Sequence, residues 1–274
     1  MIPAKFDYVR ASSADEAVQL LQQHGEDAKL LAGGHSLIPL MRLRLASPSV
    51  LVDLGPARDL SYVRDAGDHV AVGALTRHRD IETSDVLLKD VPMLAHVAGQ
   101  VGDPQVRHRG TIGGSIAHGD PASDLPAALI ALNGSLVVRG PGGERTIGID
   151  DFFQGFLETA LGESDVLTEI RVPKTGGAGW SFQKFNRRAQ DWAIVGVALQ
   201  RHNGSAGVGL VNMGSTPLRA RAVEEAVSSG ASPADAAAVA DQGADPTADL
   251  NASAEYRKHL ARVLTRRALE EAGS

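Results

Sequence analysis

Two short glycine-containing segments are the part of this sequence with the clearest chemical potential. They read AGGHS at residues 32–36 and TIGGS at residues 111–115. Glycine lacks a Cβ, so the main chain can turn sharply and a ligand can approach it closely. The first N–H groups of a helix have no partner inside it and attract phosphate. Two such segments suit a diphosphate, or one ligand held from both sides, whereas a tight turn with a helix cap explains a single Gly-Gly pair.

Asp124 is a second candidate, and two roles fit it. It lies between the second glycine segment and the apolar run LPAALIAL, which predicts a helix beginning near Leu125. The carboxylate can cap that helix, or it can accept a hydrogen bond from a ribose or ribityl hydroxyl. On the sequence alone we favour the cap.

Two other patterns resemble catalytic or nucleotide motifs without completing them. The glycines of GVG, residues 207–209, lack the third glycine of a dinucleotide fingerprint and favour a strand or bulge. GGSIA, residues 113–117, has the form of a nucleophile elbow. The neighbouring His118 and Asp120 lie too close in sequence for a hydrolase triad.

The composition restricts the class of protein. The chain has 274 residues, a formal net charge of −6 and no cysteine. The lack of cysteine excludes disulfides, thiol catalysis and cysteine-held iron–sulfur clusters on this chain. The histidines show no metal-ligand spacing, and the acidic balance argues against nucleic acid as a partner. The sequence has no apolar run long enough for a transmembrane segment and no signal peptide at its start. Any redox group is therefore expected to be an organic cofactor.

Periodicity and capping signals predict an α+β protein. Ser12 or Ser13 can cap a helix that ends at Gly25. Six strands are expected before residue 175, at 28–32, 49–54, 69–76, 135–140, 145–149 and 167–173, and the PGGE turn joins the fourth and fifth as a hairpin. The KTGGAG stretch at 174–179 is the best linker candidate. Beyond it, three antiparallel strands precede helices, the first with Thr216 as its cap and Pro217 at its first position.

The whole chain resembles the FAD-binding medium subunits of the molybdenum hydroxylase, or xanthine dehydrogenase, family. The two glycine segments are similar to the two FAD motifs of that family. The opening MIPAKFDYVRASSADEAVQLL, the segment VGDPQVRHRGTIGGS and the closing SAEYRKHLARVLTRRAL resemble it as well. The resemblance is strongest to the medium subunits of aerobic carbon monoxide dehydrogenases.

This resemblance implies a fold and a set of flavin contacts. The fold is a two-subdomain FAD-binding domain of the vanillyl-alcohol-oxidase-like (PCMH) type over residues 1–175, with subdomains of about 1–56 and 57–175. An antiparallel sheet with helices follows over residues 176–274. The cofactor-binding residues that the resemblance implies are Ala32, Gly33, Gly34, His35, Ser36, Thr111, Ile112, Gly113, Gly114, Ser115, Asp124, Leu167, Lys184 and Trp192. Many relatives have Asn in place of Ser115 and Tyr in place of Trp192, so these two contacts depart from the family pattern.

The function implied is electron transfer through FAD, with no catalytic acid or base on this chain. An iron–sulfur small subunit and a molybdenum-cofactor large subunit are the implied partners, and an external acceptor (quinone or other) receives the electrons. The expected location is cytoplasmic, with association to the inner face of the membrane left open. Three alternatives stay open at this point: a medium subunit of an aldehyde or N-heterocycle hydroxylase, a free-standing FAD oxidase, and a flavin-free scaffold protein.

Overall fold

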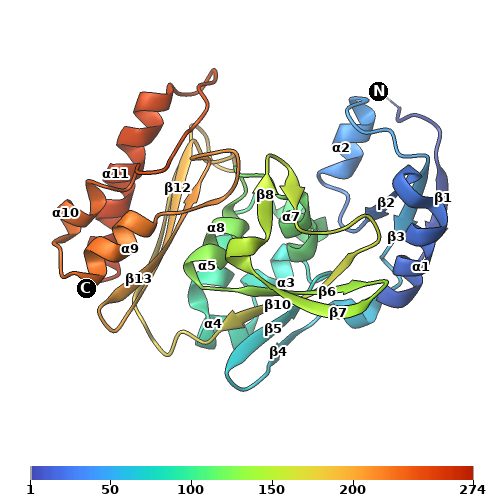
Figure 1. Ribbon diagram of the computed structural model, residues 1–274, viewed down its shortest axis with the longest axis horizontal. Coiled ribbons are helices and arrows are strands. Elements are labelled where there is room, and N and C mark those ends of the chain that lie inside the picture. Colours follow the sequence, from blue (N-terminus) through green and yellow to red (C-terminus); the bar gives the residue numbers. More distant parts are fainter. Residues whose placement is uncertain (1, 274) are drawn as a thin grey trace.

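The computed structural model describes residues 2–273 and divides their strands among three main sheets and one small hairpin (Figure 1). The first sheet is parallel, in the order β1-β3-β2, and helix α1 covers it. The elements of this part are β1 (Asp7–Arg10), α1 (Ala14–His24), β2 (Ala28–Leu31), α2 (Leu37–Arg42) and β3 (Val50–Asp53).

The start and end of α1 follow the sequence signals. Ser13 Oγ accepts a hydrogen bond from the N–H of Glu16 at 3.2 Å, and Glu16 Oε2 accepts one from the N–H of Ser12 at 2.7 Å. The helix ends at Gly25, whose φ of 56° lies in the region that favours glycine. The predicted helix is confirmed at both ends.

The second sheet is antiparallel and lies at the centre of the chain. Its strand order is β4-β5-β10-β6-β7. The strands are β4 (Val63–Asp65), β5 (His69–Gly73), β6 (Ser135–Gly140), β7 (Gly143–Gly148) and β10 (Val166–Pro173), with a separate hairpin of β8 (Phe153–Gly155) and β9 (Glu158–Thr159). The helices of this part are α3 (His78–Glu82), α4 (Asp85–Asp90), α5 (Pro92–Gly99), α6 (Pro104–Arg109), α7 (Ile112–His118) and α8 (Asp124–Ala131). Short 3₁₀ turns occur at Gly25–Asp27, Arg58–Leu60 and Ile149–Asp151.

The third sheet is antiparallel, in the order β11-β12-β13-β14, with helices on its outer face (Figure 1). Its elements are β11 (Trp180–Phe185), β12 (Val195–His202), β13 (Ser205–Val211), β14 (Leu218–Arg219), α9 (Arg221–Ser228), α10 (Pro233–Ala237) and α11 (Ala254–Glu271). One helix boundary differs from expectation. Residues after Pro217 form the short strand β14, and α9 begins only at Arg221, so Thr216 is not a cap. The pairing of Leu218 with Leu210 overrides the proline signal.

Helix α8 packs very closely on the inner face of the third sheet. A Cβ added to Gly207 would lie 2.1 Å from the carbonyl oxygen of Ala131, and one added to Gly209 would lie 2.0 Å from that of Ala127. These glycines therefore mark a close approach of helix to strand, and the strand interpretation of residues 207–209 is confirmed.

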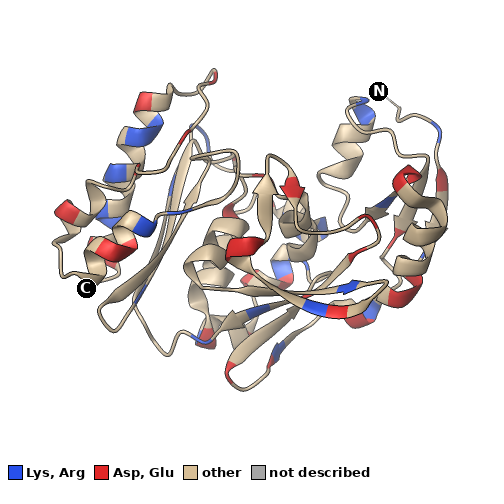
Figure 2. Cartoon of the chain, in the orientation of Figure 1, with Lys and Arg blue, Asp and Glu red and all other residues tan. Residues whose placement is uncertain are grey.

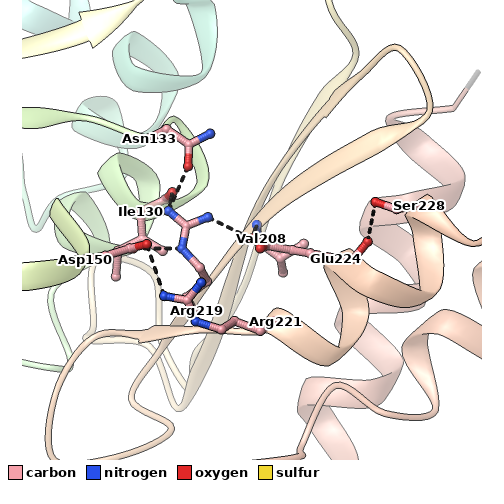
Figure 3. A network of polar contacts seen from close by, with 8 residues as sticks. All are labelled: Ile130, Asn133, Asp150, Val208, Arg219, Arg221, Glu224 and Ser228. Carbon is pink, nitrogen blue, oxygen red and sulfur yellow. Dashed lines mark hydrogen bonds and ion pairs between the residues drawn. The ribbon is translucent and has the colours of Figure 1, made fainter. Parts of the chain in front are cut away.

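Arg219 of β14 also holds α8 against the third sheet, through hydrogen bonds and ion pairs (Figure 3). Its guanidinium donates to the carbonyl oxygen of Ile130 at 2.7 Å and to Asn133 Oδ1 at 2.8 Å, both at the end of α8. It also pairs with Asp150 at 2.8 Å and with Glu224 at 2.9 Å. The largest apolar cluster continues across this boundary, because Ala198 and Val211 of the third sheet belong to the same core as the residues of α5 and α8.

Candidate functional site

The first glycine segment connects β2 to α2. Gly34 has φ of 78°, and its carbonyl oxygen accepts a hydrogen bond from the N–H of Ile38 at 3.1 Å. The main-chain N–H groups of Gly34, His35 and Ser36 donate no hydrogen bond to any residue between 2 and 273. The segment therefore presents three consecutive free N–H donors on a turn that needs glycine, as an anion site would.

The second glycine segment lies at the start of a short helix of its own, α7. Gly113 and Gly114 lie in the first turn of α7, and Thr111 Oγ1 caps this helix by accepting from the N–H of Gly114 at 3.2 Å. The N–H groups of Ile112 and Gly113 are also used, because they donate to the carbonyl oxygens of Thr76 and Ala74 at 3.0 and 2.9 Å. This segment is thus fixed by its own hydrogen bonds. It presents the exposed main chain of Gly114 to a ligand rather than free N–H groups.

The structure brings the two glycine segments into contact. A Cβ on Gly33 would lie 2.3 Å from the carbonyl oxygen of Arg109 and 2.9 Å from Gly110 Cα. A Cβ on Gly114 would lie 4.0 Å from Ala32 Cβ, and Gly114 is itself exposed. Main chain therefore packs directly on main chain, and glycine at position 33 is required by the protein's own packing as well as by any ligand.

Asp124 does not cap α8. Ser123 is the N-cap residue and makes no side-chain cap bond, whereas Asp124 is the first helical residue and its carboxylate pairs with Lys184 Nζ at 2.7 Å. Lys184 also donates to the carbonyl oxygen of Gln100 at 2.9 Å. Both side chains are only 7% exposed, so the pair is a buried link between α8 and β11. The capping role that we favoured from the sequence is wrong, because the fold supplies a cation that the sequence pattern does not reveal.

One oxygen of this pair lacks a protein partner. Asp124 Oδ1 is buried and makes no hydrogen bond to any residue in the described range 2–273. Burial raises the pKa of Asp124 to about 6, and the nearby charge of Lys184 opposes that rise. A buried polar oxygen without a partner is expected to accept from a ligand group or from water.

Leu167 and Trp192 occupy very different surroundings. Leu167 is 6% exposed and belongs to the central core, next to Thr168, whose carbonyl oxygen accepts from the N–H of Ala74 at 2.9 Å. Ala74 in turn accepts from Gly113, so Leu167 lies close to the second glycine segment. Trp192 is 59% exposed in the connection from β11 to β12.

Several residues around the glycine segments were missed by the sequence interpretation. Ala74 and Thr76 hold α7 through carbonyl oxygens, Gln100 holds Lys184 in the same way, and His78 packs against Gly110. Three of the four act through the main chain, which every residue carries, so no residue-type signal marks them.

Two family models match this chain and together span nearly all of it. Residues 4–175 match the FAD-binding domain of molybdopterin dehydrogenases, and residues 180–272 match the C-terminal domain of carbon monoxide dehydrogenase flavoproteins. The chain belongs to the family of FAD-binding subunits of molybdopterin dehydrogenases. It is an oxidoreductase subunit whose cofactor is FAD, as the resemblance implied.

Individual relatives match over their full length. The carbon monoxide dehydrogenase medium chain of Hydrogenophaga pseudoflava is 41% identical, with 99% of this chain and 98% of that one aligned. A solved structure of carbon monoxide dehydrogenase from the same organism superposes with a TM-score of 0.97, at 42% identity, over 100% of this chain and 99% of that one. The alpha subunit of the 6-hydroxypseudooxynicotine dehydrogenase complex of Paenarthrobacter nicotinovorans is 37% identical over 99% and 96% of the two chains.

Proposed function

We propose that this chain is the electron-transfer subunit of a three-subunit molybdenum hydroxylase. In this proposal substrate is oxidised on a large subunit that holds the molybdenum cofactor, and a small subunit with iron–sulfur clusters delivers the electrons here. An external acceptor, a quinone or another carrier, then receives them. The expected cytoplasmic location is part of the proposal.

The proposal is supported by the similarity to medium chains of multi-subunit dehydrogenases and by the composition of the chain. With no cysteine, this subunit has no thiolate to hold an iron–sulfur cluster, so clusters must lie on a partner. No cluster of three or more His, Asp or Glu side chains suited to a metal ion occurs in residues 2–273. FAD, when bound, supplies the redox chemistry, and the protein supplies position and electrostatics.

The contact between the two glycine segments is the observation that carries the cofactor assignment. We propose that the free N–H donors of residues 34–36 bind the diphosphate from one side, and that the glycine surface of residues 111–115 allows its close approach from the other. Asp124 Oδ1 is available to accept from a hydroxyl of the cofactor, and Lys184 holds that carboxylate. In this assignment the cofactor site is also lined by the main chain of Ala32, Gly33, Ile112 and Leu167. Trp192 lies near the flavin ring.

Carbon monoxide is the substrate we propose for the complex. Its oxidation with water to carbon dioxide releases two electrons and two protons, and the electrons are those that this subunit passes on. The support is the 41% identity to a carbon monoxide dehydrogenase medium chain. The 37% identity to a subunit of a 6-hydroxypseudooxynicotine dehydrogenase supports the second candidate, a hydroxylase of aldehydes or N-heterocycles.

The cofactor site is tested by substitution of Gly114 with valine. A Cβ there would lie 2.8 Å from Thr111 Oγ1 and 4.0 Å from Ala32 Cβ of the first glycine segment, and Gly114 is exposed. Gly114→Val should therefore block close approach of a ligand to this glycine and remove FAD from a folded chain, measured as flavin absorbance per protein after purification alone and with the partner subunits. Gly142→Val is the matched control, because a Cβ on Gly142 meets no atom within 4 Å. Wild-type FAD content in folded Gly114→Val would contradict the assignment of this segment.

A further inference from the structure

His78 is a buried imidazole directly behind the second glycine segment. It is the first residue of α3 and is 4% exposed. Its N–H donates to the carbonyl oxygen of Gly110 at 3.0 Å, and its neighbour Arg77 forms a β-bridge with Thr111. The segment from Ala74 to His78 therefore runs antiparallel to the segment from Gly110 to Gly113 and holds it by backbone hydrogen bonds.

The ring of His78 occupies the space where any other residue at position 110 would place its side chain. A Cβ on Gly110 would lie 2.8 Å from His78 Cδ2 and 2.9 Å from His78 Nε2. On its other side, Gly110 Cα would lie 2.9 Å from a Cβ on Gly33. Gly110 is thus enclosed between the imidazole ring and the first glycine segment.

The surroundings of His78 favour an uncharged ring. Burial, together with the nearby His35 of the first glycine segment and Arg107 of α6, lowers its pKa to about 4. Glu82 of the same helix is occupied by Arg79 and Arg107 at 3.2 and 3.1 Å. The Nδ1 atom is buried and has no hydrogen-bond partner among the described residues. The ring is therefore uncharged and makes no hydrogen bond within residues 2–273, and its contact with Gly110 is one of volume.

We propose that His78 is a positioning residue of the flavin site. Its neutral ring backs Gly110 and so sets the spacing between the two glycine segments that approach the FAD diphosphate. The proposal rests on the assignment of those segments to FAD. In this proposal His78 acts on the cofactor site only through Gly110.

The test is a cycle of two substitutions that change the same contact in opposite directions. His78→Ala leaves a void behind Gly110, and Gly110→Ala drives a methyl group into the ring. Each should weaken FAD binding by about tenfold, which corresponds to a modest packing defect. The double variant places the new methyl group in the vacated space, where only the carbonyl oxygen of Val106, at 3.1 Å, is still close, so its FAD affinity should exceed that of either single variant. Position 110 accepts an L-residue, since its φ is −59°.

FAD titration of the full chain, monitored by flavin fluorescence, measures these affinities, and urea unfolding without FAD measures folding. His78→Leu keeps a side chain of similar volume without nitrogen atoms and should bind FAD nearly as wild type does. Wild-type affinity in both single variants would overturn the proposal, as would a double variant that shows the summed losses. If His78→Ala does not fold, the His78→Leu and double variants decide: FAD binding by both supports the spacing role, and its loss in either overturns it.

The Gly114→Val variant separates this inference from the proposed function. If wild type binds FAD and Gly114→Val does not, while both single variants at 78 and 110 bind normally, only the role of His78 is wrong. If wild type binds no FAD alone or with its partner subunits, the cofactor site itself is wrongly assigned.

Discussion

At the scale of single residues, the Asp124–Lys184 pair is the polar contact whose disruption we expect to destabilise the fold strongly. Both side chains are buried, and the pair joins α8 to β11. Taking two charges out of water is costly, and the pair is tolerated because each charge offsets the other. Removing only the lysine leaves a buried carboxylate without its counter-charge.

We predict that Lys184→Met lowers the free energy of unfolding by about 3 kcal/mol at pH 8, in the range found when one partner of a buried pair is lost. The loss should be smaller at pH 5. The folded pKa of Asp124 is about 6, above the ordinary value of 3.8, so the folded chain holds a proton that the unfolded chain has already released. The free energy of unfolding therefore falls as the pH rises from the ordinary pKa of Asp124, 3.8, through its folded pKa of about 6. Removal of Lys184 raises the folded pKa and so extends this fall to higher pH.

Urea unfolding of the variant at the two pH values checks this prediction. Adding Asp124→Asn to the Lys184→Met chain serves as the control. An amide does not ionise, so the pH dependence of stability that Lys184→Met adds should disappear. An equal loss at pH 5 and pH 8 would show that the charge of Asp124 does not cause the effect.

Asp124 also shows where prediction from the sequence stops at this scale. An aspartate before an apolar helix is a good capping candidate, and the physical argument for a cap was sound. The lysine that claims its carboxylate lies on a strand far along the chain, and no local pattern connects the two. The role of His78 could not be predicted either, because its contact with Gly110 forms only when two segments distant in sequence pair in the fold.

At the scale of elements, Arg219 holds β14, α8 and α9 together. Its side chain is only 9% exposed, and its guanidinium contacts two carboxylates, an amide oxygen and a carbonyl oxygen (Figure 3). Arg221 pairs with the same Asp150 at 3.2 Å, but its side chain is 66% exposed. The two arginines therefore offer a buried and an exposed version of one ion pair.

Arg219→Met is expected to lower the free energy of unfolding by about 3 kcal/mol, because Glu224 and the end of α8 lose a buried partner. Arg221→Met should change it by less than about 1 kcal/mol, as exposed pairs do. Thermal or urea unfolding of the two variants, each compared with wild type, gives both values. Equal losses in the two variants would contradict the view that burial decides the contribution.

Elements with strong local signals were predicted well, and those set by distant contacts were not. The helix capped by Ser13 and strands β5, β6, β7 and β10 of the central sheet follow from periodicity, capping and turn signals. The segment after Pro217 becomes a strand because it pairs with β13, and the glycines of residues 113–114 enter a helix because Ala74, Thr76 and Thr111 hold its first turn. In both cases tertiary hydrogen bonds outweigh a local preference.

At the scale of the whole molecule, surface charge and composition limit which parts of the redox chemistry this chain can carry. Lys and Arg are interspersed with Asp and Glu on the outer helices (Figure 2), in line with the acidic net charge of −6. No helix within residues 2–273 is long and apolar enough to cross a membrane. The sequence provides no cysteine, so no cysteine-held iron–sulfur cluster can lie on this chain.

The central claim is that electrons leave the complex through this subunit after substrate has been oxidised elsewhere. Rapid-mixing spectroscopy tests it most directly, on the assembled complex with wild-type chain and with the FAD-free Gly114→Val chain. After mixing with carbon monoxide, reduction of the metal centres should proceed at the same rate in both complexes, while reduction of the external acceptor should fail in the FAD-free one. Acceptor reduction at the wild-type rate in the FAD-free complex would contradict the account, because the flavin would then not lie on the electron path.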